Sequence, residues 1–201
     1  MYKIVLASRN RKKIRELETL LSDLSSKVQV LSLDDIGYTD EILEDGDTFS
    51  ENSRIKASVP ARLGYIGIAD DSGLEVDALD GAPGVYSARF SGEGATDEKN
   101  NAKLLSLLSG VPDENRTARF RTVVTCAFPD GTDFQVDGVC EGVILHAPDG
   151  DGGFGYDPLF HYAPLNKSFA ALTADEKNAV SHRGKAMREF VKKFKEYIEQ
   201  A

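Results

Sequence analysis

Two adjacent carboxylates, Asp70 and Asp71, are followed by Ser72 and Gly73, and this group is the first candidate for chemistry. The apolar residues 66–69 predict a buried strand that ends at this polar group. Ligands of open α/β sheets bind beyond the carboxyl ends of the strands, where carboxylates can hold a hard cation or orient a water molecule for attack. The alternative is a polar turn that leaves the strand, because Asp-Ser-Gly is ordinary turn composition.

A basic segment near the N-terminus is the second candidate, and it suits a small anion. Residues 9–15 contain five of the 24 lysine and arginine residues of a chain whose formal net charge is −9. Binding to a nucleic acid is not expected, since it rests on the neutralisation of many phosphates. Ser8 and Asn10 can donate hydrogen bonds to phosphate oxygens at a helix N-terminus, and Lys13 supplies a point charge. The alternative is an N-capped helix with a solvated basic first turn, although cations there oppose the helix dipole.

A glycine-rich segment is the third candidate. Four glycines lie between residues 150 and 155, and such a backbone can approach a ligand closely. The rings of Phe154 and Tyr156 can stack on a purine, and Asp157 can accept hydrogen bonds from a base or a sugar. The alternative is a flexible surface loop.

A histidine–arginine pair close to the C-terminus completes the candidates. Ser181 is a natural N-cap, which places His182 and Arg183 in the first turn of the last helix. The pair is interpreted either as an ordinary surface pair or as a contact to a nucleobase or a phosphate.

The spacing of apolar residues predicts the elements that position these groups. Residues 3–7 and 27–33 are expected to form strands, and the segment between them a helix that follows residue 13 and has the apolar stripe Ile14, Leu17, Leu20, Leu21 and Leu24. Thr48 and Glu51 fit a capping box that opens another helix, which is expected to kink or end near Pro60.

The C-terminal half adds a long hairpin and two more helices. Residues 97–108 predict a helix that buries Leu104, Leu105, Leu107 and Leu108. The alternation over residues 117–128 and the return over 133–145 predict antiparallel strands, and the last helix has the apolar face Ala186, Phe190, Phe194 and Ile198. We therefore expect an α/β fold, with a mixed twisted sheet flanked by helices, and a single domain over residues 1–201.

Composition and the two cysteines bear on partners and compartment. No apolar run reaches the ~18 residues that a membrane helix needs, and the first residues lack a signal-peptide pattern, so no membrane partner is expected. On a hairpin that turns at residues 129–132, Cys126 faces Gln135 rather than Cys140, and the two thiols lie too far apart for a disulfide. We expect both to be buried thiols in a reducing compartment, the cytoplasm.

Six segments, taken in order, resemble the inosine triphosphate pyrophosphatases, which are also called XTP/dITP diphosphatases. The resemblance covers nearly the whole chain, and it rests on Ser8-Arg-Asn-Arg-Lys-Lys13, Thr48-Phe-Ser-Glu-Asn52, Ala69-Asp-Asp-Ser-Gly-Leu74, Gly81-Ala-Pro-Gly-Val-Tyr-Ser-Ala-Arg89, Gly152-Gly-Phe-Gly-Tyr-Asp-Pro158 and Ser181-His-Arg183. Each motif is weak alone, but six in order are specific. The pair Ser8-Arg9 departs from the family, in which Thr-Gly is commoner.

The resemblance implies a homodimeric, Mg²⁺-dependent enzyme with two lobes around a central nucleotide cleft. It would convert the non-standard purine triphosphates ITP, dITP and XTP to the monophosphate and pyrophosphate. Asp71 would be the proton acceptor and a metal ligand, with Asp70 and Lys56 as further catalytic residues. Glu44 would be the second metal ligand, or Glu51 in its place. The substrate-binding residues would be Ser8, Arg9, Asn10, Arg11, Lys12, Lys13, Ser72, Phe154, Gly155, Tyr156, Asp157, Lys177, His182 and Arg183.

Selection of the base is expected to rest on the 6-oxo group, because a site with donors for that oxygen rejects the amino group of adenine. His182 and Arg183 are the candidate donors. Three other readings stay open. A Maf-like nucleotide pyrophosphatase would prefer other nucleotides, a metal-dependent phosphomonoesterase would release orthophosphate, and a nucleotide sensor would bind without turnover.

Overall fold

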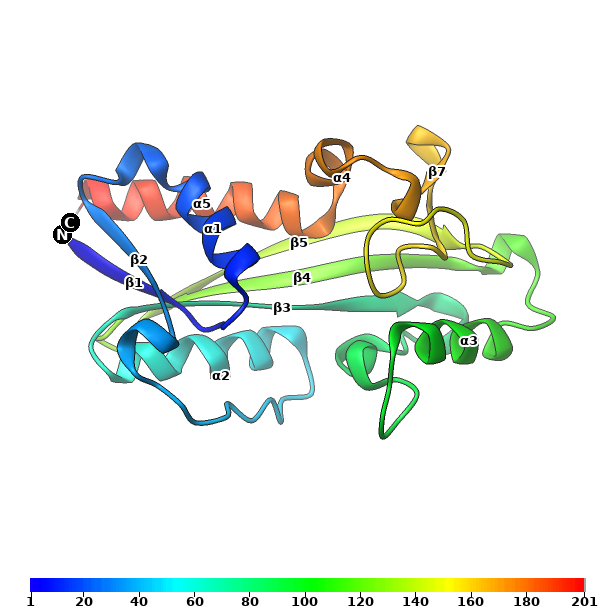
Figure 1. Ribbon diagram of the computed structural model, residues 1–201, viewed down its shortest axis with the longest axis horizontal. Coiled ribbons are helices and arrows are strands. Elements are labelled where there is room, and N and C mark those ends of the chain that lie inside the picture. Colours follow the sequence, from blue (N-terminus) through cyan, green and yellow to red (C-terminus); the bar gives the residue numbers. More distant parts are fainter. Residues whose placement is uncertain (201) are drawn as a thin grey trace. The chain divides into compact units, whose positions relative to one another are not determined.

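The computed structural model describes residues 1–200 and has the predicted α/β architecture (Figure 1). Within these residues one mixed sheet has the strand order β2-β1-β3-β4-β5-β6-β7. β1 runs parallel to β2 and β3, whereas β6 is antiparallel to β5 and β7. The strands are β1 (Tyr2–Leu6), β2 (Val28–Ser32), β3 (Ile66–Val76), β4 (Thr117–Ala127), β5 (Asp133–Ile144), β6 (Phe160–Tyr162) and β7 (Lys167–Ser168). The helices are α1 (Arg11–Leu20), α2 (Phe49–Arg62), α3 (Asp97–Leu107), α4 (Ala174–Val180) and α5 (His182–Gln200).

Short 3₁₀ turns connect several of these elements, and the chain divides into two compact units. The 3₁₀ turns are Ser22–Leu24, Asp34–Ile36, Asp77–Leu79, Gly84–Arg89, Asp113–Asn115, Ala163–Leu165 and Phe169–Ala171. The first unit comprises Met1–Asp71, Val123–Val136 and the chain from Ala186 onward, and the second comprises Ser72–Thr122 and Asp137–Lys185. Each unit has a hydrophobic core of its own.

The core of the first unit forms from the apolar stripes that the sequence predicts. Ile14, Leu17 and Leu21 of the α1 segment are buried in one cluster with β1. The α5 face pointing into the same cluster consists of Ala186, Phe190, Phe194 and Ile198, which are all buried. Residues spaced by three and four share one face of a helix, and this periodicity needs no information from the rest of the chain.

Helix α2 lies unusually close to β3. Its Ala57 and Ala61 form a cluster of small buried side chains with Ala69. Gly67 makes this approach possible, since a Cβ at that position would lie 1.9 Å from the carbonyl oxygen of Ala57. The predicted capping box of Thr48 is confirmed at the start of α2. The helix continues through Pro60 to Arg62, so it ends two residues beyond the proline.

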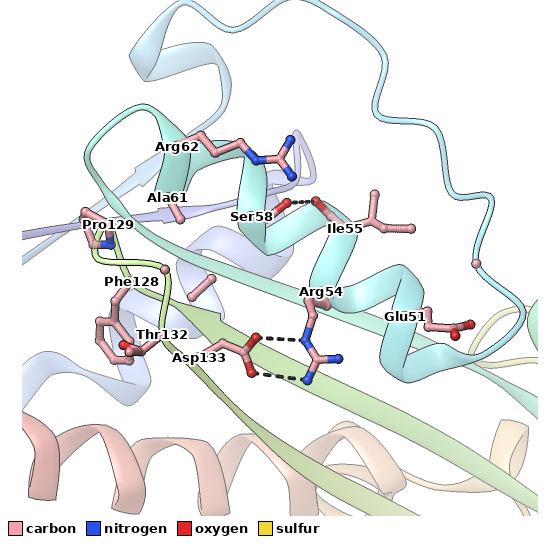
Figure 2. A pocket seen from close by; sticks show the side chains of 13 residues that line it. Glu51, Arg54, Ile55, Ser58, Ala61, Arg62, Phe128, Pro129, Thr132 and Asp133 are labelled. Atoms are coloured by element: carbon pink, nitrogen blue, oxygen red, sulfur yellow. Dashed lines mark hydrogen bonds and ion pairs between the residues drawn. The ribbon is translucent and has the colours of Figure 1, made fainter.

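One side of α2 and the β4–β5 turn line a cavity of about 550 Å³ that is open to solvent (Figure 2). An ion pair crosses it, in which Arg54 Nε donates to Asp133 Oδ2 at 2.8 Å. Of the residues that the sequence assigns to the site, only the alternative ligand Glu51 lines this cavity. The cavity is therefore distinct from the group of carboxylates around Asp71.

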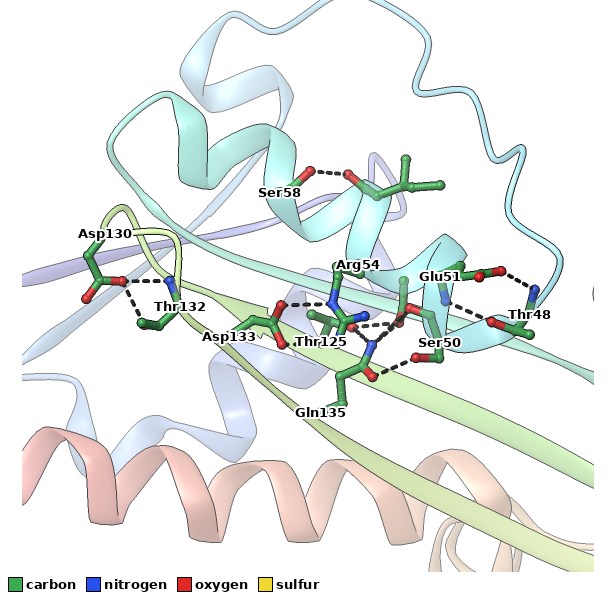
Figure 3. A network of polar contacts seen from close by, with 12 residues as sticks. Thr48, Ser50, Glu51, Arg54, Ser58, Thr125, Asp130, Thr132, Asp133 and Gln135 are labelled. Carbon is green, nitrogen blue, oxygen red and sulfur yellow. Dashed lines mark hydrogen bonds and ion pairs between the residues drawn. The ribbon is translucent and has the colours of Figure 1, made fainter.

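A buried polar network fixes α2 to the hairpin (Figure 3). Ser53 Oγ and Thr125 Oγ1 are 2.6 Å apart, and Gln135 Nε2 donates to Thr125 Oγ1 at 2.8 Å and to the carbonyl of Ser50 at 2.9 Å. Ser50 Oγ donates back to Gln135 Oε1 at 2.7 Å. Ser53 and Thr125 are buried, Ser50 and Gln135 are partly buried, and all four have partners. Such a network makes the packing angle of α2 specific rather than merely hydrophobic.

The core of the second unit is rich in aromatic side chains. Phe120 packs with its ring centroid 4.6 Å from that of Phe160 and 5.6 Å from that of Phe169. Helix α3 buries Leu104, whereas Leu107 is 48% exposed, contrary to the prediction that it is buried. Leu107 lies about 60° around the helix from Leu104, on the side that faces solvent.

The extent of β3 differs from the prediction. The strand does not end at Ala69 but continues through the Asp-Asp-Ser-Gly segment to Val76. Leu74 and Val76 are fully buried in the core of the second unit, and their burial draws the backbone onward as a strand. The carboxylates therefore lie in the middle of a strand and not in a turn.

Within residues 1–200, no helix is both long enough and apolar enough to span a bilayer. Cys126 and Cys140 are free and buried, as predicted. Burial raises the pKa of Cys140 to about 11, and it also raises the pKa of Cys126.

The Cys140 thiol gives the stability of the fold a measurable dependence on pH. Its folded pKa lies above the value of about 8.5 for an exposed thiol. The buried neutral thiol therefore contributes its full stabilisation of the fold below about pH 8.5. This stabilisation is lost as the pH rises towards about 11. In urea unfolding under reducing conditions, the free energy of unfolding of Cys140→Ala should fall less steeply with pH than that of the native protein. Equal slopes would contradict the burial of this thiol.

Candidate active site

Strand geometry sends the two adjacent carboxylates to opposite faces of β3. The pairing of β1 with β3 ends at Leu6 and Ile68, so Asp70 and Asp71 lie just beyond the carboxyl end of β1. Successive side chains of a strand point to opposite faces. In the first unit, α1 and α2 lie on opposite sides of β3 (Figure 1). Asp70 therefore meets a lysine of α1, and Asp71 meets a lysine of α2.

Lys56 of α2 holds two carboxylates together. Its Nζ lies 3.0 Å from Asp71 Oδ1 and 2.7 Å from Glu44 Oε2, and its side chain is only 13% exposed. Burial raises the pKa of Asp71, and the Glu44 carboxylate adds to this while the Lys56 ammonium opposes it. Burial alone would lower the pKa of Lys56, but the two carboxylates outweigh it and raise that pKa. Lys56 is therefore protonated, and Asp71 is a better proton acceptor than an exposed aspartate.

On the other face, Lys13 Nζ bonds Asp70 Oδ2 at 2.7 Å. Asp70 is buried, whereas the Lys13 side chain is one-third exposed. An ammonium in this position neutralises the buried carboxylate and still presents N–H groups to solvent. The structure thus brings Lys13, Asp70, Asp71, Lys56 and Glu44 together around one stretch of β3.

The basic segment itself is arranged differently from the prediction. Helix α1 begins at Arg11, three residues before the expected start, because Asn10 is its N-cap. Asn10 Oδ1 accepts from the backbone N–H groups of Lys12 and Lys13, and Ser8 Oγ accepts from the N–H of Asn10. Two of the N–H groups that would otherwise bind an anion are thus already satisfied by Asn10.

The cations of this segment do not form one patch. Arg11 and Lys13 are two residues apart in a helix and so lie about 200° apart around it. Arg11 lines a separate cavity of about 500 Å³ with Arg15 and Asp35. Arg9 turns instead to the segment after β2, where it donates to Asp34 Oδ1 at 3.2 Å. Lys12 is exposed.

The two alternatives for the second carboxylate ligand have different surroundings. Glu44 faces Lys56, as described. Glu51 Oε2 accepts from the backbone N–H groups of Asp47 at 2.8 Å and Thr48 at 3.0 Å, as part of the capping box. Because the Glu51 carboxylate caps α2, the geometry favours Glu44 as the partner of Asp71.

In the second unit, a buried carboxylate organises the glycine-rich loop. Asp157 is 3% exposed and bonds Lys177 Nζ and the N–H of Phe154. Gly153 has φ +76°, and a Cβ there would lie 2.2 Å from Asp157 Oδ2. Asp157 therefore shapes the loop and holds Lys177. Oδ2 is thus engaged within the protein, and a hydrogen bond from a base or a sugar to Asp157 stays a prediction.

The two aromatic residues of this loop differ in exposure. Phe154 is 74% exposed, and Lys177 Nζ lies 4.5 Å from the centroid of its ring. Tyr156 is 4% exposed, and its hydroxyl donates to the carbonyl of Ser87 at 2.8 Å. Only Phe154 presents a ring for stacking, which corrects the expectation that both do.

Two residues that the sequence did not single out hold the backbone of the same loop. Gly155 N–H donates to Asp97 Oδ2 at 2.7 Å, and Asn101 Nδ2 donates to the carbonyl of Gly155 at 2.9 Å. Both come from the first turns of α3, and they are one turn apart in the helix. The (i, i+4) spacing predicts that Asp97 and Asn101 share one face of a helix, but it does not predict which part of the chain they contact.

The predicted pair at the start of α5 is half-buried. Ser181 Oγ accepts from the N–H of Gly184 at 3.1 Å, which confirms it as a cap. The ring of His182 stacks on Phe120, with centroids 4.9 Å apart and planes at 16°. Arg183 is also half-buried, and Ser72 of β3 is exposed. The stacking on Phe120 fixes the plane of the imidazole.

Comparison with known proteins shows to which family the chain belongs. The model of the Ham1 family matches residues 4–193. The chain belongs to the Ham1 family. A dITP/XTP pyrophosphatase of Desulforamulus reducens is 52% identical over 187 residues, which cover 92% of each chain. Another, of Geobacter sulfurreducens, is 52% identical over 188 residues and covers 93% of this chain and 94% of its own.

A solved Ham1 structure has the same fold. A HAM1 protein from Coxiella burnetii superposes with a TM-score of 0.92 at 39% identity, covering 98% of this chain and 100% of its own. This agreement confirms the predicted mixed α/β sheet and the family resemblance. The roles of individual residues in this Ham1 chain stay predictions.

The Lys177–Asp157 pair should be worth far more to stability than an exposed pair of the same type. Lys177→Met leaves a buried carboxylate uncompensated and should lower the free energy of unfolding by about 3 kcal/mol. Lys167→Met breaks the more exposed pair with Glu176 and should cost at most about 1 kcal/mol. Adding Asp157→Asn to Lys177→Met should recover part of the loss. Equal losses in urea unfolding of the two lysine variants would show that Asp157 is not buried as described.

Proposed function

We propose that this Ham1 chain hydrolyses the non-standard purine triphosphates ITP, dITP and XTP to the monophosphate and pyrophosphate. The observation that carries the proposal is the ammonium of Lys56 between Glu44 and Asp71. Lysines that can bind phosphate groups lie beside carboxylates that can hold a cation and orient a water molecule. The substrate class is supported by the relatives named dITP/XTP pyrophosphatase, which are about half identical to the chain.

The residues on β3 and its neighbouring helices supply the chemistry. Phosphoryl transfer depends mostly on positioning and on neutralisation of charge. Lys13 and Lys56 are ammonium groups beside the carboxylates and can hold the triphosphate oxygens. Asp71, whose pKa is raised by burial and by Glu44, would orient the attacking water and accept its proton.

A magnesium ion fits the carboxylates of the first unit. Glu44 and Asp71 converge on a single cation, the ammonium of Lys56. Among residues 1–200 no three His, Cys, Asp or Glu side chains cluster as a metal centre. Mg²⁺ is commonly held by one or two carboxylates together with substrate phosphates, so two are sufficient. When bound through Asp71 and Glu44, Mg²⁺ would neutralise charge on the triphosphate.

The second unit would recognise the nucleoside. Phe154 presents an exposed ring beside the ammonium of Lys177, and such a ring can stack on any purine. His182 and Arg183 would donate to the 6-oxo group. A donor at that place discriminates against the 6-amino group of adenine, because a mismatched buried polar group is costly.

The proposal also includes a cytoplasmic location and a homodimer, as the family resemblance implies. The two free thiols are compatible with a reducing compartment. The mass of the native protein in sedimentation equilibrium would test the dimer.

The products of ITP test the reaction directly. In ³¹P NMR with Mg²⁺, the native protein should release IMP and pyrophosphate from ITP and much less from ATP. Asp71→Asn should lower kcat about 100- to 10,000-fold, since it removes the proton acceptor. Asp137→Asn, a surface carboxylate paired with Arg121, is the matched control and should leave kcat unchanged. Orthophosphate as the product would mean a phosphomonoesterase, and binding without turnover a sensor.

Selection of the base gives a separate test. His182→Ala should lower the preference for ITP over ATP, measured as the ratio of their kcat/KM values, by at least about tenfold. His146→Ala removes an exposed histidine that pairs with Asp113 and should leave the ratio unchanged. An unchanged ratio in His182→Ala would remove His182 from this role.

A further inference from the structure

Arg9 makes an unusual set of contacts for a residue of a segment that is predicted to bind phosphate. Its Nε donates to Asp34 Oδ1 at 3.2 Å, and its Nη2 donates to the carbonyl oxygens of Tyr38 at 2.9 Å and Asp40 at 3.2 Å. All three acceptors belong to the segment that follows β2. Residues 34–47 are rich in aspartate and glutamate and are called the acidic segment below. The guanidinium therefore joins the loop before α1 to the beginning of this segment.

The acidic segment needs such an anchor, because little else orders it. Residues 38–46 form neither a helix nor a strand. The far end is fixed to α2, where Gly46 N–H donates to Asn52 Oδ1 at 2.9 Å and Asp47 N–H donates to Glu51. Ordering a residue costs roughly 1–2 kcal/mol of backbone entropy, so a stretch of this length needs contacts at both ends.

Glu44 lies between the two anchored ends. Its carboxylate reaches Lys56 Nζ at 2.7 Å, but the side chain is 37% exposed, so packing contributes little to its position. The position of Glu44 therefore depends on where the segment is held. The near end is held by Arg9 and the far end by the start of α2.

We propose that Arg9 is a positioning residue that fixes the Glu44 carboxylate beside Asp71 and thereby sets the affinity for the metal ion. The inference rests on the proposed function for the identity of that ion. A guanidinium suits this role because its donors form a rigid fork that serves several acceptors, whereas the single ammonium of lysine cannot span them. The role differs from the predicted contact of Arg9 with substrate, and the two make different predictions.

Arg9→Gln should act on the acidic segment and on the metal, and little on the nucleotide. Hydrogen exchange of residues 38–45, measured by mass spectrometry without metal or nucleotide, should become at least about tenfold faster, while α2 exchanges as before. The Mg²⁺ concentration for half-maximal activity should rise about tenfold, and the KM for ITP at saturating Mg²⁺ should change less than twofold. Arg9→Lys should behave much like Arg9→Gln.

Two comparisons separate this role from general loosening of the fold. Arg15→Gln removes a nearby exposed arginine that has no bond to the acidic segment, and it should leave both measurements unchanged. Glu44→Gln should raise the Mg²⁺ requirement by itself, and adding Arg9→Gln should raise it no further, because Arg9 acts through Glu44. Full additivity of the two changes would overturn the proposal.

A higher KM for ITP in Arg9→Gln, with an unchanged Mg²⁺ requirement, would overturn the proposal in favour of substrate contact. Unchanged exchange of residues 38–45 would overturn it as well. Exchange is read without nucleotide or metal, so this result does not depend on the reaction. If the native protein released no pyrophosphate, the proposed function would fail while the exchange measurement still decided whether Arg9 anchors the segment.

Discussion

A single ammonium group, that of Lys56, joins the two carboxylates on which the proposed chemistry depends. It stands beside Asp71 only because α2 lies directly against β3. Gly67 permits that approach, since any side chain at this position would collide with the carbonyl of Ala57. The residue next to Ala57 in the helix is Lys56. The absence of a side chain at Gly67 of β3 therefore determines where Lys56 of α2 lies.

The rest of the first unit holds α2 in that place. The capping box uses Glu51 to begin the helix, and the network around Gln135 fixes its inner face to β4 and β5. Each of these contacts has a consequence for the site. Because Glu51 caps the helix, the carboxylate that faces Lys56 must come from another part of the chain. It comes from Glu44, in a segment whose order depends on Arg9.

The sequence predicts correctly the features that depend only on residues close together in the chain. The apolar face of α5 and the capping box at Thr48 follow from spacing over a few residues, and both are confirmed. The apolar stripe, which begins at Ile14, predicts a start for α1 that is three residues late, because the cap, Asn10, lies before the stripe. With the start at Arg11, helical geometry alone separates Arg11 from Lys13.

What is decided by distant partners could not be read from the chain. Whether Asp70 ends a strand or lies within one depends on what Leu74 and Val76 pack against, and those neighbours come from other elements. Burial of Tyr156 depends in the same way on the carbonyl of Ser87. The local charge of Arg9 predicts a contact with phosphate, but it gives no sign of the three acceptors, which lie 25 to 31 residues further along the chain.

The charges around β3 also explain why, on the proposed function, nucleotide and metal ion should bind together. Lys13 and Lys56 neutralise Asp70 and Asp71 in the protein alone. A triphosphate that draws these lysines away would leave carboxylates that are largely buried without a counter-charge, which costs several kcal/mol. A divalent cation held by Asp71 and Glu44 would offset that cost at the carboxylates while the lysines serve the phosphates. A nucleotide without the cation should therefore bind weakly, whatever the number of basic residues nearby.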